Sequence, residues 1–165
     1  MADSARSLLD ALTAHFEAGT KGISGALGLM ATFATVLKAE KAEIKARHDE
    51  ALKGETAIYQ KASEGDWLKR RDAYYKGLTE AEYLQFRSRM IEYLVAWFGD
   101  ALRQQAGGTQ LDLPDYAGVT RKVADKHPGP ELDRKIQSVE KLRAHLETNV
   151  HETLAMEVAF IRTFA

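Results

Sequence analysis

The sequence predicts an all-α protein, a helical bundle that includes a long antiparallel helical hairpin. Apolar residues recur every three or four positions along most of the 165-residue chain, as on one face of a helix. Only three prolines are present, β-branched residues are scattered, and helix-favouring residues are abundant. We expect one domain over residues 1–165. Residues 1–107 would form a helix and the hairpin arm, and residues 108–165 a three-helix part.

Charge and composition exclude several classes of protein. The net charge of -1 lacks the basic surplus of a dedicated nucleic-acid binder. Without cysteine there is no disulfide, thiolate zinc site or iron–sulfur cluster. The first residues do not read as a signal peptide, and no apolar run approaches the roughly 20 residues that span a bilayer. We therefore expect a soluble, cytoplasmic protein with no metal, no cofactor and no membrane contact.

Two helices precede the middle of the chain. The first covers residues 4–16, carries an apolar face and ends at Gly19. From Ile23 onward, steps of four and three residues predict a heptad seam on a helix that extends to Lys53. Polar Lys41 and His48 occupy two seam positions. The apolar seam positions are Ile23, Leu27, Met30, Ala34, Leu37, Ile44 and Ala51.

A return helix is expected to pair with this one. Gly54 and residues 63–66 are expected to interrupt the helical structure, and the sequence from Thr79 to Glu82 matches a capping box. The periodic stripe that follows ends at Gly107-Gly108. We predict that residues 23–52 and 83–102 form the antiparallel hairpin.

Three shorter helices are expected in the last third of the chain. The first, from Pro114, points Tyr116, Val119 and Val123 inward and stops at residues 127–130. The second ends near Leu146, and the last begins at about Val150. Because the last helix is apolar on nearly all sides, we expect a partner to cover part of it.

A search for catalytic motifs gives no candidate residue. The chain has no phosphate-binding GxxxxGK[ST] loop, and residues 22–26 lack the second glycine of a nucleophile elbow. Residues 151–155 begin like HExxH, but Ala155 stands where the second zinc-binding histidine belongs. The five histidines are dispersed, and we interpret them as surface or interface residues. We expect a protein that is not an enzyme.

One short segment suggests contact with nucleic acid. Basic residues there alternate with rings that stack on bases. The candidates are Trp67, Lys69, Arg70, Arg71, Tyr74 and Tyr75. The alternative, which we favour, is that the rings pack on the hairpin while the basic groups stay in water.

Residues 147–157 resemble a segment near the C-terminus of bacterial DNA polymerase III clamp-loader subunits, most of all delta-prime. The residues that match in place are Asn149, Val150, Leu154, Ala155 and Glu157. Residues 151–153 read His-Glu-Thr where the family has Asn-Pro-Arg. The helix over 136–146 resembles the family's penultimate helix, and residues 100–108 resemble the end of its first long helix.

The resemblance implies that the chain is a collar domain, cut from a longer subunit. Collars of five subunits form the ring that holds together the loader of the sliding clamp. The implied partners are subunits of the gamma/tau and delta types, with DNA reached only weakly or through the complex. A gamma/tau collar, a collar of another clamp-loader-like ATPase, a free-standing helical adaptor and a nucleic-acid-binding hairpin stay open as alternatives.

Contacts with neighbouring subunits are expected on the last two helices, driven by burial of apolar area. The candidates are Leu142, Leu146, Asn149, Leu154, Val158, Phe160 and Ile161. The sequence does not decide which of these residues face the core and which face a partner.

Overall fold

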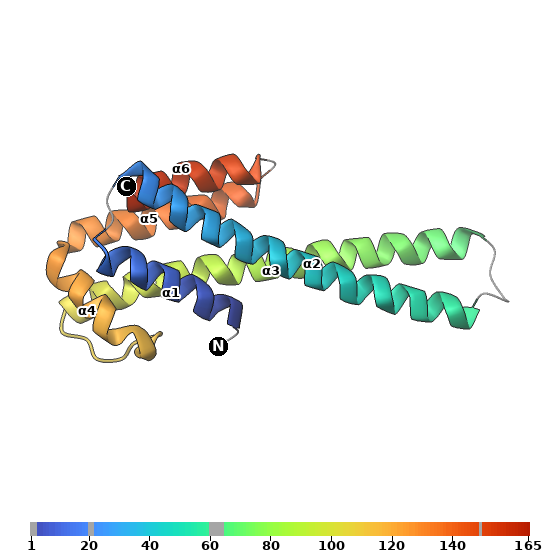
Figure 1. The fold of residues 1–165 in the computed structure, drawn as a ribbon, viewed down its shortest axis with the longest axis horizontal. Helices are drawn as coiled ribbons and strands as arrows, with labels where there is room; N and C mark the ends of the chain where they lie inside the picture. Colours follow the sequence, from blue (N-terminus) through green and yellow to red (C-terminus); the bar gives the residue numbers. More distant parts are fainter. Residues whose placement is uncertain (1–2, 20–21, 60–64, 149) are drawn as a thin grey trace. The chain divides into compact units, whose positions relative to one another are not determined.

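All regular structure in the described part of the chain is helical, which confirms the predicted all-α class. The computed structural model describes residues 3–19, 22–59, 65–148 and 150–165. The helices (Figure 1) are α1 (Asp3–Glu17), α2 (Ile23–Tyr59), α3 (Gly65–Gln105), the 3₁₀ turn η1 (Pro114–Tyr116), α4 (Ala117–Lys126), α5 (Gly129–Leu146) and α6 (Glu152–Phe164). The chain divides into two compact units, the first formed by residues 1–34 with 88–165 and the second by residues 35–87.

Aromatic side chains from four helices form the core of the first unit. Phe16 of α1 stacks on Trp97 of α3 with the ring centroids 4.8 Å apart. Phe33 of α2 contacts Phe160 of α6 at 5.2 Å, and Phe164 lies 5.3 Å from Phe160. Such ring pairs add to the free energy gained by burying their large apolar areas. The aromatic residues therefore fix which side of α6 faces inward.

Helix α3 ends at the predicted glycine pair. The Gly108 N–H donates to the carbonyl of Arg103 at 2.9 Å, and the Gly107 N–H donates to that of Gln104 at 3.0 Å. These two bonds and the φ of +84° at Gly107 define a Schellman motif. A side chain at Gly108 would begin only 2.7 Å from the Arg103 Cγ. Both positions therefore require glycine.

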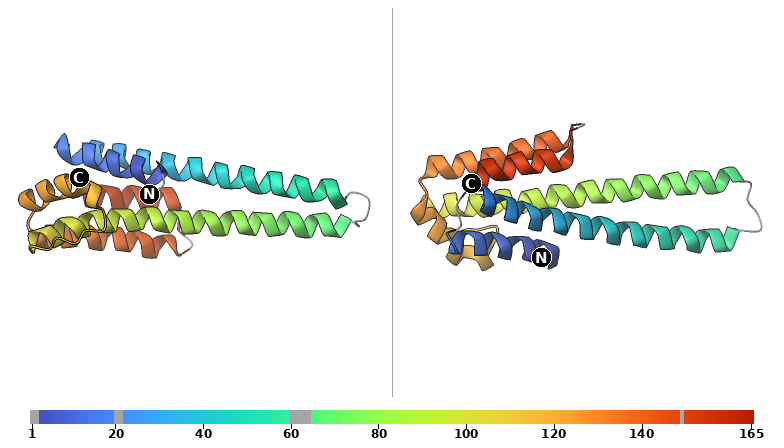
Figure 2. Two further views of the ribbon diagram at one scale, coloured as in Figure 1. Left: turned by 90° about the horizontal axis from the view of Figure 1, so that it is seen from below. Right: turned by 45° about the horizontal axis from the view of Figure 1, so that its top comes forward.

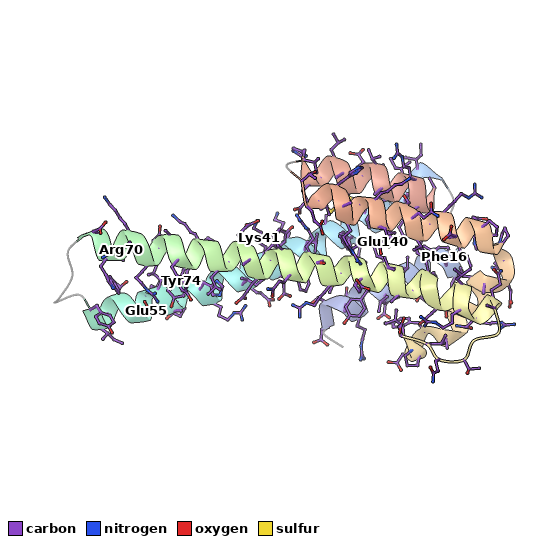
Figure 3. The ribbon with its side chains drawn as sticks, turned by 180° about the vertical axis from the view of Figure 1, so that it is seen from behind. Phe16, Lys41, Glu55, Arg70, Tyr74 and Glu140 are labelled. Atoms are coloured by element: carbon purple, nitrogen blue, oxygen red, sulfur yellow. The ribbon has the colours of Figure 1, made fainter. Side chains whose placement is uncertain are left out.

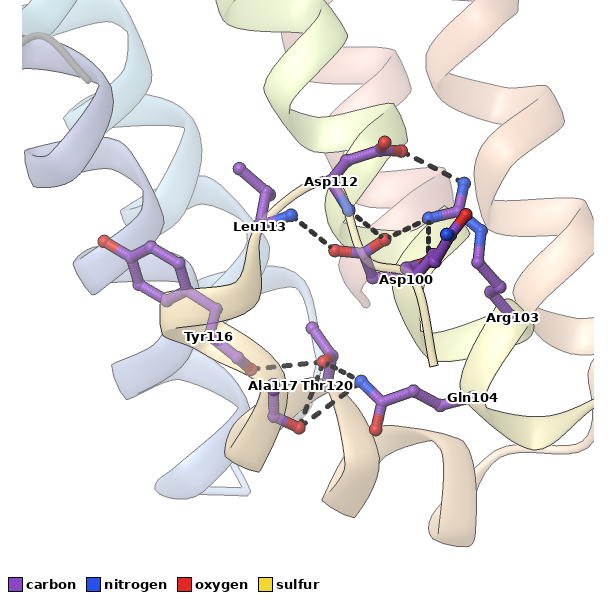
Figure 4. Close-up of polar contacts among 9 residues, drawn as sticks. Asp100, Arg103, Gln104, Asp112, Leu113, Tyr116, Ala117 and Thr120 are labelled. Carbon is purple, nitrogen blue, oxygen red and sulfur yellow. Dashed lines mark hydrogen bonds and ion pairs between the residues drawn. The ribbon is translucent and has the colours of Figure 1, made fainter. Parts of the chain in front are cut away.

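A buried carboxylate then holds the chain that leaves α3 (Figure 4). Asp100 is fully buried, and its two oxygens accept the backbone N–H groups of Asp112 at 2.9 Å and Leu113 at 2.8 Å. Arg103 donates to the same carboxylate at 2.6 Å and reaches the Asp112 carboxylate at 3.1 Å. The loop is thus fastened to the last turns of α3 through charge-assisted hydrogen bonds.

Tyr116 connects η1 to α1. Its hydroxyl donates to Asp10 Oδ1 at 2.9 Å. Burial of the ring and this hydrogen bond raise the pKa of Tyr116 to about 12. Tyr116, Val119 and Val123 are all buried, as the periodicity of this segment predicts.

The raised pKa of Tyr116 makes stability depend on pH in alkali. Unfolded tyrosine titrates near pH 10, so between about pH 10 and 12 the folded chain keeps a proton that the unfolded chain has lost. Stabilisation that is complete below pH 10 is therefore lost as the pH rises through 12. We expect the unfolding free energy to fall by about 2 kcal/mol more than in Tyr116→Phe over this interval. Urea denaturation at several alkaline pH values measures how the unfolding free energy changes with pH in the natural chain and in Tyr116→Phe. An equal change in the two proteins would contradict the prediction.

The second unit contains two antiparallel helical segments, residues 35–59 of α2 and 65–87 of α3. Residues that come later in α2 pair with residues that come earlier in α3. The cross-helix contacts are Lys41–Glu80 at 3.2 Å, Arg47–Glu82 at 2.8 Å, His48–Thr79 at 2.8 Å, Tyr75–Glu55 at 2.7 Å and the Arg71–Glu55 ion pair. Polar side chains thus pair between the two segments, beside the buried apolar residues Leu37, Ile44, Tyr83 and Phe86.

The buried face of α2 differs from the predicted seam at its N-terminal end. The predicted residues Ile23, Leu27, Met30 and Ala34 are exposed or half-buried, Ile23 to 58%. The buried residues lie one position earlier than the last three of these: Ala26, Leu29 and Phe33. Phe33 contacts the Phe160 ring, and this aromatic contact sets the orientation of the helix. Further along, the predicted positions Leu37, Ile44 and His48 are buried. The predicted positions Lys41 and Ala51 are exposed, so the seam prediction is wrong at its C-terminal end as well.

Two predicted interruptions of the helices are wrong. Helix α2 continues through Gly54 to Tyr59, and α3 runs without a break through the predicted capping box at Thr79. The Thr79 hydroxyl donates to the carbonyl of Tyr75 one turn earlier, at 2.8 Å, so it caps no helix. Glu82 bonds across to Arg47 and His48. These residues serve the contact between the two segments and not a helix end.

Helix α2 is long and apolar enough to cross a membrane, judged by length and composition alone. The sequence has no uninterrupted apolar run of membrane-spanning length, but the criterion met by α2 is the mean hydropathy over 18 residues, which tolerates polar residues in between. The small residues at the start of α2 raise its average apolar character without forming such a run. Ala26, Leu29 and Phe33 are buried, but only 22% of the apolar window of α2 is buried inside the protein.

Candidate partner-binding groove

Helices α5 and α6 lie side by side in the first unit (Figure 1 and Figure 2), joined by the short segment 147–151. Apolar residues on one face of each helix are buried. They are Leu132, Val139, Leu142 and Leu146 of α5, with Met156, Ala159, Phe160 and Phe164 of α6. The Lys135 ammonium donates to the carbonyl of Thr163 at 2.5 Å, so the start of α5 lies beside the end of α6. The pair is therefore antiparallel.

A groove with a volume of about 480 Å³ lies along this helix pair. It is lined by Arg134, Gln137, Ser138, Lys141, Leu142, His145, Val150, His151, Leu154, Ala155, Val158, Ala159 and Arg162. Three apolar residues are exposed in it: Val150 to 44%, in the segment before α6, and Leu154 to 58% and Val158 to 40%, which lie one turn apart on α6. Apolar side chains at this helical spacing form a stripe that suits the apolar face of another helix.

The lysines and arginines that line the groove have no acidic residue among the other described lining residues, although Glu157 lies next to Val158 on α6 outside the lining. Helices α5 and α6 carry five lysines and arginines, of which Lys135 and Arg143 form ion pairs. Within the described part of the chain, no ion pair reaches the other three: Arg134, Lys141 and Arg162. All three are exposed and line the groove, and none of its described lining residues is Asp or Glu. Arg134 donates to the carbonyl of Pro130 at 3.2 Å, which leaves its charge without an acidic partner. The groove thus combines apolar side chains with positive charges that have no ion pair in the described part of the chain.

The predicted interface residues fall on both sides of α6 and α5. Leu142, Leu146 and Phe160 are buried in the first unit, and Ile161 is half-buried. Leu154 and Val158 are exposed in the groove, whereas Asn149 lies outside the described residues. Among the interface predictions, Leu154 and Val158 are therefore the residues free to meet a partner. Val150 is not among the predicted residues, since it precedes α6 and helical spacing does not place it beside Leu154.

The candidate nucleic-acid segment lies in the second unit, and acidic neighbours occupy most of its charges. Arg71 and Tyr75 both bond to the Glu55 carboxylate, and Figure 3 labels Glu55 on one helix and Arg70 and Tyr74 on the other. Arg70 lies 3.6 Å from Asp66. Hydrogen bonds from Arg71 and Tyr75 lower the pKa of Glu55.

The aromatic rings of this segment also contact other side chains, although Tyr74 stays partly exposed. Trp67 lies 5.3 Å from Tyr59, and the Arg71 guanidinium lies over the Tyr74 ring at 4.7 Å. Tyr74 is nevertheless 53% exposed, and Lys69 is exposed. Pairing of this kind leaves few groups for phosphates and bases, which favours the packing interpretation over nucleic-acid binding.

A second cavity of about 940 Å³ lies at the ends of α1 and α6 and holds several titratable groups. His127 Nδ1 lies 2.8 Å from a Glu131 oxygen, and burial lowers the pKa of both His15 and Lys135. The Lys135 ammonium is held by the Thr163 carbonyl at the C-terminal end of α6. A lysine in this position satisfies a free helix carbonyl, so its role is explained by capping.

Neither a metal site among the described residues nor a comparison with known proteins identifies the groove. In the described ranges, no group of three or more His, Asp or Glu residues is arranged to hold a metal ion. The clamp-loader resemblance of residues 147–157 stays a prediction. Searches against protein-family models, curated proteins and solved structures returned no match to this chain.

Proposed function

We propose that this chain is a non-catalytic docking module and that the groove on α5 and α6 receives an apolar-faced helix of a partner protein. The observation that carries the proposal is the exposed stripe of Val150, Leu154 and Val158. Met156 and Phe160, on the opposite side of α6, are buried in the core, so the stripe faces away from the core. An apolar stripe beside a helix pair is the arrangement of helix-in-groove recognition.

A partner protein suits the groove better than a second copy of the chain. In a two-fold dimer the same patch meets itself, so the unpaired Arg134, Lys141 and Arg162 of one copy would face those of the other. Like charges brought together in an interface oppose association. The occupant is thus a different helix, whose apolar residues cover the stripe.

Titration with a neutral helical peptide tests the docking function. The probe is a stapled amphipathic helix of about five turns, with leucines on one face and alanine and glutamine elsewhere. We expect amide NMR shifts at Val150, Leu154 and Val158, and at least about tenfold weaker binding to Leu154→Asp, because a carboxylate replaces an apolar contact. Leu68→Asp, an equal change at a 43% exposed leucine of the second unit, is expected to bind normally. Absence of binding to the natural chain would contradict the proposal.

More specifically, we propose that the partner is a clamp-loader subunit of the gamma/tau or delta type. Its support is the resemblance of residues 147–157 to the delta-prime segment, because these residues include Val150 and Leu154 of the exposed stripe. The chain should then co-purify with those subunits when they are expressed together, and Leu154→Asp should weaken the association. If the subunits retain a known delta-prime protein but not this chain, the clamp-loader assignment is wrong. The more general docking function would still stand.

A further inference from the structure

We infer that the helix received by the groove is acidic, with carboxylates beside its apolar face. This inference rests on the proposed docking function and specifies the chemistry of the partner. Its basis is the distribution of charge on α5 and α6. Of the five lysines and arginines there, the two that point elsewhere are paired with acidic residues, and the three in the groove are not.

The positions of the three cations define where those carboxylates lie. Arg134 and Arg162 belong to the same end of the groove, because the neighbouring residues Lys135 and Thr163 are hydrogen-bonded to each other. Lys141 lies seven residues after Arg134 on α5, or roughly 10 Å along the helix axis. An occupying helix therefore meets two arginines at one end and a lysine about two turns further along.

The stripe lies among these cations and not apart from them. Leu154 and Val158 line the groove together with Arg134, Lys141 and Arg162. A helix whose apolar face covers the stripe must bring its edge residues close to the cations. Glutamate or aspartate at those edges forms ion pairs there, whereas lysine or arginine is repelled. The groove thus selects for charge as well as for apolar surface.

Three stapled peptides with the same leucine face and equal helicity test this selection. Their edge positions carry glutamate, glutamine or lysine. For three exposed ion pairs we expect the glutamate peptide to bind about tenfold more tightly than the glutamine peptide in about 50 mM NaCl. The lysine peptide should bind more weakly than either. The advantage of glutamate should largely disappear in about 500 mM NaCl, because salt screens exposed charges.

Matched triple variants separate the groove from the net charge of the protein. In Arg134→Gln/Lys141→Gln/Arg162→Gln, the glutamate and glutamine peptides should bind equally. In Lys38→Gln/Lys69→Gln/Arg89→Gln, which removes the same charge from exposed residues outside the groove, the tenfold preference should persist. A preference lost in both variants would mean that net charge produces it, and the inference would be overturned.

The remaining outcomes distinguish failure of the inference from failure of the docking function. Equal binding of the glutamate and glutamine peptides, abolished in both cases by Leu154→Asp, overturns the acidic partner and leaves docking intact. Binding of no peptide overturns both. Leu154-dependent binding to phosphatidylglycerol vesicles without peptide binding identifies an anionic lipid surface, and Leu154-dependent dimerisation in sedimentation identifies a second copy. Either result overturns the inference.

Discussion

Asp100→Ala is expected to destabilise the first unit by about 3 kcal/mol. Asp100 is fully buried, and its carboxylate accepts two backbone N–H groups and one arginine hydrogen bond. Alanine leaves the Leu113 N–H buried without an acceptor and removes the buried partner of the Arg103 cation. Hydrogen bonds to a charged acceptor contribute more than neutral ones, and unsatisfied buried donors add their desolvation cost.

Two further variants distinguish the hydrogen bonds from the charge. Asp100→Asn keeps one acceptor oxygen but turns an NH₂ group toward a backbone N–H, so its cost should approach that of alanine. Asp112→Ala removes only an exposed carboxylate near Arg103 and should cost less than about 1 kcal/mol. Urea denaturation gives the free energies, and hydrogen exchange reports whether the Leu113 amide opens first. A loss below about 1 kcal/mol in Asp100→Ala would show that the loop does not depend on this carboxylate.

Features set by local residues were predictable from the sequence. The glycine pair that ends α3 forms the expected stop because its backbone geometry depends only on neighbouring residues. The inward faces of η1 and α4 follow the periodicity of their apolar residues, since Tyr116, Val119 and Val123 are buried. In each case, a short stretch of sequence contains both the signal and its cause.

Features set by distant residues were not predictable. The start of α2 is apolar on several sides, and the contact between Phe33 and Phe160 decides which side is buried. Thr79 and Glu82 have the spacing of a capping box, but α2 supplies Arg47 and His48 as partners. Local spacing cannot reveal a partner that lies more than thirty residues away in the chain.

The groove, too, was predictable only where local sequence determines it. Leu154 and Val158 could be named as contact candidates because α6 carries apolar residues on more than one side. Their exposure could not be predicted, since the aromatic core sets the orientation of α6. The three unpaired cations were not predictable either. Whether a lysine or arginine is paired depends on acidic residues elsewhere, such as Glu92 beside Arg143.

Phe160→Ala and Leu154→Ala, two truncations on α6, are expected to differ by at least about 2.5 kcal/mol in their effect on stability. Phe160 is 1% exposed and contacts the Phe33 and Phe164 rings, so alanine leaves a cavity and should cost about 3–5 kcal/mol. Leu154 is 58% exposed, so its truncation should cost less than about 0.5 kcal/mol. Denaturant unfolding of the full chain measures both.

The comparison between these two residues also bears on function. A leucine that contributes little to folding yet lies in a groove beside unpaired cations has its apolar surface available for a partner. If Leu154→Ala were as costly as Phe160→Ala, Leu154 would belong to the core, and the docking stripe would lose its central residue. If Leu154→Ala instead leaves stability unchanged and weakens the glutamate and glutamine peptides alike, folding and docking are assigned to opposite sides of the same helix. The charge preference would then be due to the three cations alone, because truncating an apolar side chain changes affinity without changing the ratio between the two peptides.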